Sequence, residues 1–346
     1  MINLDKWQWQ PPEDWLQIKT IDLHTGGEPL RVVYQGLPNI EGSTILEKRR
    51  FFKNNLDHIR TGIMFEPRGH ADMYGAIITE PTSTNADFGT FFMHNEGYST
   101  MCGHAIIALT KLVFDTGMIT KDGDTPELLI DAPPGQIRAK AFRKNNIVEK
   151  VSFLNVPSFV LYQNESLVIE GIGQVQFDIA FGGAFYALVD ADQLNLKLTS
   201  DNYNQLIHWG RKIKLAIIKK YPITHPFEDD LSFLYGSIFT GKAHTPNHHS
   251  RNVCIFADGE VDRSATGSGV SARAALHYAK GELQLNETIT IESILGTTMD
   301  VKVSEETTYG TFPALIPEVS GTAHITGKNE FCFDPNDPLK DGFIFR

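Results

Sequence analysis

The stretch that decides the fold occurs twice in the chain, as MCGHAIIA at residues 101–108 and as ATGSGVSA at residues 265–272. In each copy the second position is followed by glycine and then by a helical pattern. Each pattern runs equally far and ends at a glycine, Gly117 in the first copy and Gly281 in the second. Glycine readily adopts the left-handed conformation that ends a helix. The repetition indicates two related halves, each containing one helix of this kind.

A second repeat lies earlier in each half. Residues 21–33 read IDLHTGGEPLRVV, and residues 177–189 read FDIAFGGAFYALV. Both place an aspartate four residues before a Gly-Gly pair and then return to apolar strand residues. One such match can arise by chance, but the two repeats occur in the same order and at similar separations. Together they favour a duplicated fold whose halves meet at a cleft.

The remaining pattern predicts an α+β protein rich in antiparallel sheet. Most of the chain reads as short strands broken by Gly, Asn, Asp and Pro, and residues 151–156 show the apolar–polar alternation of a half-buried strand. Longer helical patterns are few. The clearest cover residues 104–116, 269–280 and 202–219.

The repeats predict two domains and a short tail. The first domain is expected to cover residues 18–160 and to carry Cys102, and the second to cover residues 161–330 and to carry Thr266. The length of 346 residues agrees with this division, since one hydrophobic core rarely organises so long a chain. The tail, residues 331–346, is expected to pack on the first domain.

Composition excludes several classes of protein. The chain has 42 acidic and 31 basic residues, a net charge of −11, which argues against a nucleic-acid or anionic-membrane partner. Three cysteines are too few for a disulfide framework or a structural zinc site. Residues 1–15 lack the apolar core of a signal peptide, and no apolar run approaches the about 18 residues of a membrane span. We therefore expect a cytoplasmic protein with reduced thiols.

The two repeated helix starts carry the most promising chemistry. If a pseudo-twofold axis relates the halves, Cys102 and Thr266 face one another across the cleft. The helix dipole and the first-turn N–H groups favour thiolate over thiol, which makes Cys102 a stronger base and nucleophile. A free cysteine is more often a small buried hydrophobe, but the matching position in the other half favours function. The free N–H groups of the two first turns form a ready anion site: those of Gly103, His104, Gly267 and Ser268.

Other candidate residues have competing interpretations. Asp262 is either a turn or capping residue before the second helix, or a carboxylate that binds a substrate ammonium at the cleft. Cys254 and Cys332 are interpreted as core strand residues. Residues 68–73 are interpreted as a turn into a strand.

No metal or cofactor site is expected. The cluster of His244, His248 and His249 lies in a loop rich in Pro, Asn and Ser, without helical spacing and without a carboxylate nearby in sequence. Solvated loop histidines are the better interpretation. The chain contains no phosphate-binding loop, dinucleotide fingerprint or Ser-His-Asp arrangement.

Four motifs resemble the proline racemase family, over nearly the whole chain after about residue 18. They are DLHTGGEP at residues 22–29, RGHADM at 68–73, MCGH at 101–104 and DRSATGSG at 262–269. The resemblance implies the two-domain fold shared with diaminopimelate epimerase, with mostly antiparallel strands wrapped around a central helix in each pseudo-symmetric domain. It also implies a homodimer with a cofactor-free site between the domains and an amino acid as the small-molecule substrate.

The resemblance further implies which residues act. Racemases and 4-hydroxyproline epimerases of this family carry cysteine in both repeats, whereas this chain has Thr266 in the second. A Cys/Thr pair resembles the trans-3-hydroxy-L-proline dehydratase branch. Ala265 stands where the family usually has proline, and this difference could loosen the turn before Thr266. Five residues are implied to hold the amino acid: Gly103, His104, Asp262, Gly267 and Ser268.

The change from cysteine to threonine favours elimination over racemisation. Racemisation needs an ionisable group on each face of the α-carbon. A thiol, with a reference pKa of about 8.5, can serve, whereas an alcohol without an adjacent base cannot. With Cys102 as the only base, the carbanion loses its β-hydroxyl as water. Two alternatives stay open: a proline racemase or hydroxyproline 2-epimerase, and a non-catalytic amino-acid-binding protein.

Overall fold

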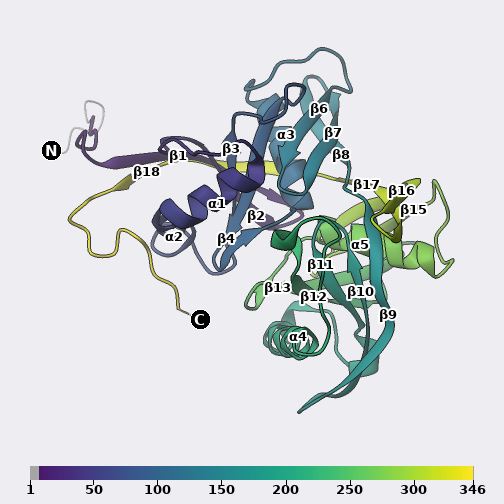
Figure 1. Cartoon of the computed structure of the whole chain (residues 1–346). Helices are drawn as coiled ribbons and strands as arrows, with labels where there is room; N and C mark the ends of the chain where they lie inside the picture. The colour runs from purple at the N-terminus through teal and green to yellow at the C-terminus, as the bar shows by residue number, and fades with distance from the viewer. Residues whose placement is uncertain (1–7, 346) are drawn as a thin grey trace.

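The computed structural model describes residues 8–345, so the first part of the N-terminal segment discussed above lies outside the described residues. Figure 1 shows two lobes joined by long strands. The first lobe contains the following elements: β1 (Leu16–Thr25), β2 (Glu28–Gln35), α1 (Ile45–Asn55), α2 (Asp57–Met64), β3 (Tyr74–Thr79), β4 (Phe88–His94), β5 (Gly97–Ser99), α3 (Gly103–Asp115), β6 (Glu127–Ala132), β7 (Gly135–Lys144) and β8 (Ile147–Leu154).

The second lobe is built from the next part of the chain, and the last strands connect the two lobes. Its elements are β9 (Ser158–Ile169), β10 (Gly173–Phe181), β11 (Phe185–Asp190), α4 (Tyr203–Ile218), β12 (Leu234–Gly241), β13 (Ser250–Phe256), β14 (Glu260–Val261), α5 (Gly267–Ala279) and β15 (Thr288–Glu292). The connecting strands are β16 (Thr298–Tyr309), β17 (Phe312–Gly321) and β18 (Ala323–Phe333).

Each lobe wraps its strands around one buried helix, so the expected α+β fold with a central helix in each half is confirmed. Helix α3 packs against strands β1, β2, β7, β8, β17 and β18, and α5 packs against β9, β10, β11, β16 and β17. The sequence of α3 is apolar nearly all round, as a helix enclosed on every side requires. The glycines that end the two helices, Gly117 and Gly281, both have φ of +73°, in the left-handed region predicted for them.

The last strands tie the lobes together and return the chain to its start. Strand β17 pairs antiparallel with β16, β8 and β9, and therefore spans the junction. Strand β18 pairs along the whole length of β1, from Thr25 opposite Ala323 to Leu16 opposite Phe333. The tail continues along the first lobe, where Phe343 forms a β-bridge with Glu66. The chain thus returns to the first lobe at Ala323, before residue 331.

The three predicted helices are confirmed as α3, α4 and α5, but the sequence analysis missed α1 and α2. Helix α1 reads ILEKRRFFKNN and buries Ile45, Arg49 and Phe52, so a charged residue interrupts its apolar stripe. Its start does carry a signal, because the Thr44 hydroxyl accepts a hydrogen bond from the Glu47 N–H at 3.1 Å. The capping residues were a better guide here than hydrophobic periodicity.

The two Gly-Gly pairs explain the second sequence repeat. A Cβ added at Gly27 would lie 2.5 Å from Cδ1 of Leu295 and in contact with the Arg263 Cβ at 3.5 Å, in the loop that leads into α5. A Cβ added at Gly183 would lie 2.6 Å from the Cβ of Met101, just before α3. Each glycine turn therefore packs against the loop that precedes the central helix of the opposite lobe, and leaves no room for a side chain.

Candidate active site

The site lies where the N-termini of α3 and α5 meet. A Cβ placed on Gly267 would lie 2.6 Å from the Cα of Gly103, and one placed on Gly103 would lie 2.6 Å from the Cα of Gly267. Only glycine allows the two helices to approach so closely. The free N–H groups of both first turns therefore converge on one region, where both helix dipoles favour negative charge.

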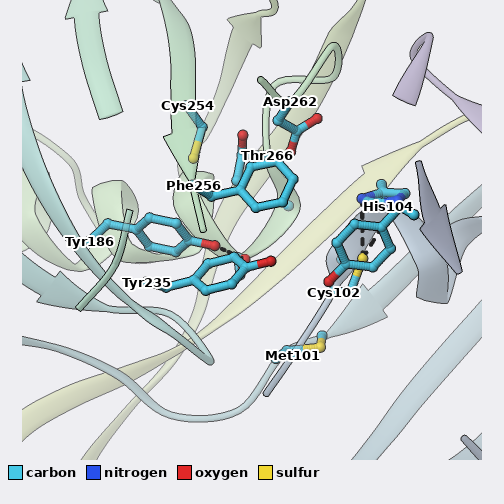
Figure 2. A pocket seen from close by; sticks show the side chains of 13 residues that line it. Met101, Cys102, His104, Tyr186, Tyr235, Cys254, Phe256, Asp262 and Thr266 are labelled. Atoms are coloured by element: carbon cyan, nitrogen blue, oxygen red, sulfur yellow. Dashed lines mark hydrogen bonds between the residues drawn. The ribbon is translucent and has the colours of Figure 1, made fainter. Parts of the chain in front are cut away.

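A pocket at this junction brings together all seven residues selected from the sequence. It is tight, with a cavity volume of about 20 Å³. Figure 2 shows Cys102 and His104 on one side of it, and Thr266, Asp262 and Cys254 on the other. The selected residues that line it are Cys102, Gly103, His104, Asp262, Thr266, Gly267 and Ser268.

Cys102 is the N-cap of α3 and is only 4% exposed. Its Sγ accepts a hydrogen bond from the Ala105 N–H at 3.4 Å and lies 3.1 Å from Nδ1 of His104. Burial raises the pKa of the Cys102 thiol well above its usual range, while the Ala105 N–H lowers it. The helix N-terminus lowers the pKa of Cys102, as predicted, but the loss of solvation raises it by more. The free enzyme therefore holds Cys102 as a thiol.

His104 is uncharged in this setting. Burial lowers the pKa of its imidazole to about 3. Its ring packs edge-on against Tyr74, with centroids 4.8 Å apart, and its carbonyl oxygen accepts a hydrogen bond from the Thr25 hydroxyl at 2.8 Å. A neutral imidazole beside Cys102 can donate or accept a hydrogen bond without adding charge to the pocket.

Thr266 occupies the position in α5 that corresponds to Cys102, but its side chain behaves differently. Its backbone has φ of +67°, and its side chain makes no capping hydrogen bond. The Thr266 hydroxyl is buried and has no hydrogen-bond partner among residues 8–345. Because φ > 0 is unfavourable for a β-branched residue, the surrounding structure must hold this conformation in place.

The turn before Thr266 is held by hydrogen bonds despite the alanine at position 265. The Ala265 carbonyl accepts a hydrogen bond from Nδ2 of Asn252 at 3.0 Å, and Arg273 donates to the Asn252 side chain at 2.9 Å. The Thr266 N–H donates to Ser264 Oγ at 3.1 Å. This buried network positions the turn that contains Ala265.

Asp262 has the turn role that was one of its two interpretations, and its position at the pocket leaves the ammonium-binding role as a prediction. One carboxylate oxygen accepts a hydrogen bond from the Ser264 N–H at 2.7 Å, which stabilises the turn before α5. The same side chain lines the pocket and is buried. Burial raises the pKa of this carboxyl group, so an adjacent cation would be needed to stabilise its charged form fully.

The sequence analysis missed several pocket residues. Cys254 is a buried strand residue of β13, as predicted, but it also lines the pocket. Cys332, predicted as a core strand residue, lies in β18 but is only partly buried. No local motif marks the aromatic lining residues, because they come from strands far apart in the sequence: Tyr74, Tyr186, Tyr235 and Phe256.

Glu28 is a further residue whose position the GGEP motif could have indicated. It is fully buried, and its Oε2 accepts a hydrogen bond from the Arg263 N–H at 2.7 Å. Burial, followed by the charge of Asp262, raises the pKa of Glu28 well above its usual range. Glu28 thereby links the Gly-Gly turn of the first lobe to the loop that carries Asp262.

One residue of the histidine cluster has a carboxylate partner that lies far away in sequence. His248 Nδ1 lies 2.9 Å from Glu292 Oε1, and Arg251 donates to the same carboxylate at 2.8 Å. No group of three or more His, Cys, Asp and Glu side chains among residues 8–345 is arranged to hold a metal ion. None of the described helices has the length and apolar run that a membrane crossing requires.

Known proteins with similar sequences share this fold and the full length of the chain. Residues 20–344 match the family model described as proline racemase. A trans-3-hydroxy-L-proline dehydratase of Colwellia psychrerythraea is 53% identical over 98% of this chain and 96% of its own. A 3-hydroxyproline 2-epimerase of Burkholderia multivorans is 44% identical over 95% of this chain and 98% of its own. The crystal structure of a hydroxyproline epimerase from Agrobacterium vitis, with bound trans-4-hydroxy-L-proline, is 26% identical with a TM-score of 0.90, covering 95% of this chain and 96% of that one.

Proposed function

The chain belongs to the proline racemase family, and from this premise we propose that it is a trans-3-hydroxy-L-proline dehydratase, a hydro-lyase, whose base is Cys102. Relatives with this activity in their names are 44–53% identical over nearly the full length. The product is Δ1-pyrroline-2-carboxylate, formed by loss of the α-proton and the 3-hydroxyl as water.

The asymmetry of the pocket is the observation that carries this proposal. One helix N-terminus presents the sulfur of Cys102, and the other presents the alcohol of Thr266. A threonine hydroxyl is far too weak an acid to exchange protons with carbon near neutral pH. Proton abstraction is therefore confined to one face of the substrate, and the carbanion proceeds to products by expelling its β-hydroxyl.

The remaining residues bind and orient the amino acid. Asp262 holds the ring ammonium, and the first-turn N–H groups of the two helices hold the carboxylate. As the α-proton leaves, negative charge moves onto that carboxylate, whose N–H donors then bind it more strongly. Each such donor contributes about 3 kcal/mol in comparable oxyanion sites. The donors in question are the backbone amides of Gly103, His104, Gly267 and Ser268.

Substrate binding itself activates Cys102. The charges of Asp262 and Glu28 add to the effect of burial in raising the pKa of the thiol. A substrate ammonium bound to Asp262 offsets its charge and so lowers the pKa of Cys102 in the complex. The thiolate then forms where the α-proton lies within reach.

The stereochemistry permits a syn elimination with one acid–base group. In trans-3-hydroxy-L-proline the hydroxyl lies trans to the carboxylate, on the same ring face as the α-hydrogen. The Cys102 thiolate takes the α-proton, the electron pair of the C–H bond forms the C2=C3 double bond, and the C3–O bond breaks. The departing oxygen takes the proton from Sγ and leaves as water, which returns Cys102 to the thiolate. The enamine product then tautomerises to the cyclic imine. We propose that Thr266 packs and hydrogen-bonds across the substrate.

The decisive experiment is an imine assay with trans-3-hydroxy-L-proline, using trans-4-hydroxy-L-proline and L-proline as controls. The wild-type enzyme should form the cyclic imine from the first substrate only. Cys102→Ser should abolish the reaction, because serine is too weak an acid to replace the thiol. An enzyme with reduced Cys102 that leaves trans-3-hydroxy-L-proline unchanged would show that the proposal is wrong.

A 2-epimerase is the second candidate, favoured by the relative from Burkholderia multivorans that bears that name. It would require water or another group to deliver a proton to the second face. Incubation of L-proline in D₂O separates the two functions, because an epimerase inverts Cα and labels it with deuterium, whereas the dehydratase proposed here does not invert it.

We further propose that the enzyme acts in the cytoplasm as a homodimer, as the family resemblance implies. The three cysteines are all free, which is compatible with a reducing compartment. Light scattering coupled to size-exclusion chromatography would measure the assembly, and a monomeric mass at working concentration would contradict the dimer.

A further inference from the structure

Three tyrosine side chains line the pocket, and only one of their hydroxyl groups lacks a partner. The Tyr74 hydroxyl is hydrogen-bonded to Ser99 Oγ, and the Tyr186 hydroxyl to Ser268 Oγ at 2.7 Å. The Tyr235 hydroxyl has no hydrogen-bond partner in the part of the chain from residue 8 to 345, although Tyr235 is only 6% exposed. A buried hydroxyl without a partner is unfavourable, so its presence at the pocket needs a reason.

The ring of Tyr235 is fixed by its neighbours. It lies on strand β12 and stacks on Phe256 with ring centroids 5.3 Å apart. The rings of Tyr186 and His94 pack edge-on against it at 5.9 Å and 6.0 Å. These contacts leave the hydroxyl little freedom to turn toward another protein group, and Figure 2 shows it directed into the pocket.

Tyr235 comes from the second lobe, and Figure 2 shows its hydroxyl pointing across the pocket toward Cys102. Tyr74 lines the same pocket, and burial together with the charge of Cys102 raises the pKa of its phenol, so it is a protonated neighbour of both groups. In trans-3-hydroxy-L-proline the α-hydrogen and the 3-hydroxyl share one ring face. A substrate whose α-hydrogen faces Cys102 therefore presents its 3-hydroxyl toward the tyrosine pair.

We propose that Tyr235 is the catalytic residue that receives the substrate's 3-hydroxyl and donates a hydrogen bond to that oxygen as it leaves. This inference rests on the proposed function. The proton that completes the water comes from Cys102 Sγ, and Tyr235 keeps its own. Burial raises the pKa of the Tyr235 phenol well above its usual range, which keeps it protonated as a donor.

The same hydrogen bond makes Tyr235 a specificity residue. L-Proline has no 3-hydroxyl and would leave the buried phenol without a partner in the complex. Sites built to bind a substrate hydroxyl discriminate strongly against analogues that lack it, because the buried group of the protein then stays unpaired. The unpartnered phenol thus selects cyclic amino acids with a hydrogen-bonding leaving group at C3.

The test compares two leaving groups in the wild type and in Tyr235→Phe. Elimination of hydroxide needs a donor at the oxygen, whereas fluoride leaves from trans-3-fluoro-L-proline without being protonated. We expect Tyr235→Phe to lower kcat for trans-3-hydroxy-L-proline by about 100-fold, the effect of losing one preorganised donor, and to lower kcat for the fluoro substrate less than about 5-fold. Melting temperature should be unchanged or higher, since the substitution removes an unsatisfied hydroxyl.

Tyr186→Phe is the matched control, because the hydroxyl of Tyr186 already bonds Ser268. It should lower turnover of both substrates by the same factor. Equal loss on both substrates in Tyr235→Phe, or no loss on either, would overturn the role of Tyr235 while leaving the proposed function intact. A wild-type enzyme that fails to dehydrate trans-3-hydroxy-L-proline would overturn both.

Discussion

Two residues in equivalent positions of the repeat act differently because of their side-chain chemistry. Cys102 accepts a hydrogen bond from the first turn of α3, whereas Thr266 adopts φ > 0 and its hydroxyl has no hydrogen-bond partner within residues 8–345. Sulfur can hold a negative charge near neutral pH and the alcohol cannot. In the proposed mechanism this one difference confines proton exchange to a single face of the substrate.

The pH dependence of activity should report the buried thiol. In the proposed mechanism only the thiolate of Cys102 abstracts the proton, and the fraction of Cys102 present as thiolate rises with pH until the pKa is passed. Because burial raises that pKa, kcat/KM should increase by about tenfold per pH unit through neutrality and continue to rise above about pH 8.5, the ordinary thiol midpoint. The pH profile of initial rates checks this prediction, and a plateau reached well below that pH would contradict it.

Restoring the second thiol should restore a second proton path. Thr266→Cys places an ionisable group at the start of α5, so we expect D-proline to form from L-proline at a rate at least about 100-fold above that of the parent enzyme. Chiral chromatography measures the product. No detectable inversion would mean that a second thiol is insufficient without further changes in the pocket.

At the scale of elements, the site depends on how closely two helices approach. Helices α3 and α5 meet through the backbone of Gly103 and Gly267, and this contact brings the free N–H groups of both first turns to one region, the proposed carboxylate site. The glycines were selected from the sequence because they let a ligand approach the backbone. The structure adds that they also let the helices approach each other.

Gly267→Ala should therefore damage both stability and activity. The added methyl group would meet backbone atoms of Gly103 at 2.6 Å, which cannot move as a side chain can. We expect a loss of about 1–3 kcal/mol in the free energy of unfolding and at least about 100-fold in kcat/KM, measured by denaturant titration and by the imine assay.

Gly117→Ala is the control for this prediction. Its new Cβ would meet nothing within 4 Å, but φ is +73°. It should lose about 1–2 kcal/mol through backbone strain while keeping kcat unchanged. Similar activity losses in both variants would show that the helix contact has no special role.

For the whole molecule, the small volume of the pocket leads us to expect that the lobes separate to admit a substrate. Polar contacts across the junction hold the lobes together. Asp230, in a short 3₁₀ helix of the second lobe (Asp229–Leu231), pairs with Arg50 of α1 at 2.8 Å. Asp72 of the first lobe accepts hydrogen bonds from Arg263 at 2.9 Å and from the Tyr203 hydroxyl at 2.8 Å.

Asp230→Asn should weaken the closed arrangement without touching the chemistry. An exposed ion pair contributes about 0.2–1 kcal/mol, so KM should rise by about 1.5- to 5-fold with kcat nearly constant. High salt should raise KM in the parent enzyme and have less effect in the variant, because the pair it screens is already gone. A large fall in kcat would show instead that Asp230 supports the catalytic groups themselves.

The sequence alone determined the duplicated plan of the protein. Two local features carried this information: glycines that end helices in the left-handed conformation, and helix starts repeated at equal spacing. Both can be recognised in the sequence without knowledge of tertiary contacts. They predicted the central helices and the positions of Cys102 and Thr266. The short amphipathic helices α1 and α2 escaped because charged residues such as Arg49 interrupt their apolar stripes.

Only the tertiary structure decided the protonation of Cys102 and which residues line the pocket. Solvation of Cys102 depends on how completely two lobes enclose it, and this burial outweighs the helix dipole that local sequence predicts. Tyr235 and Cys254 line the pocket but lie in strands whose sequences indicate only a buried core. Apolar and aromatic residues suit a protein core and a ligand pocket equally well, so the sequence pattern does not distinguish the two. The partners of a side chain depend on contacts distant in sequence, and those exist only once the lobes have met.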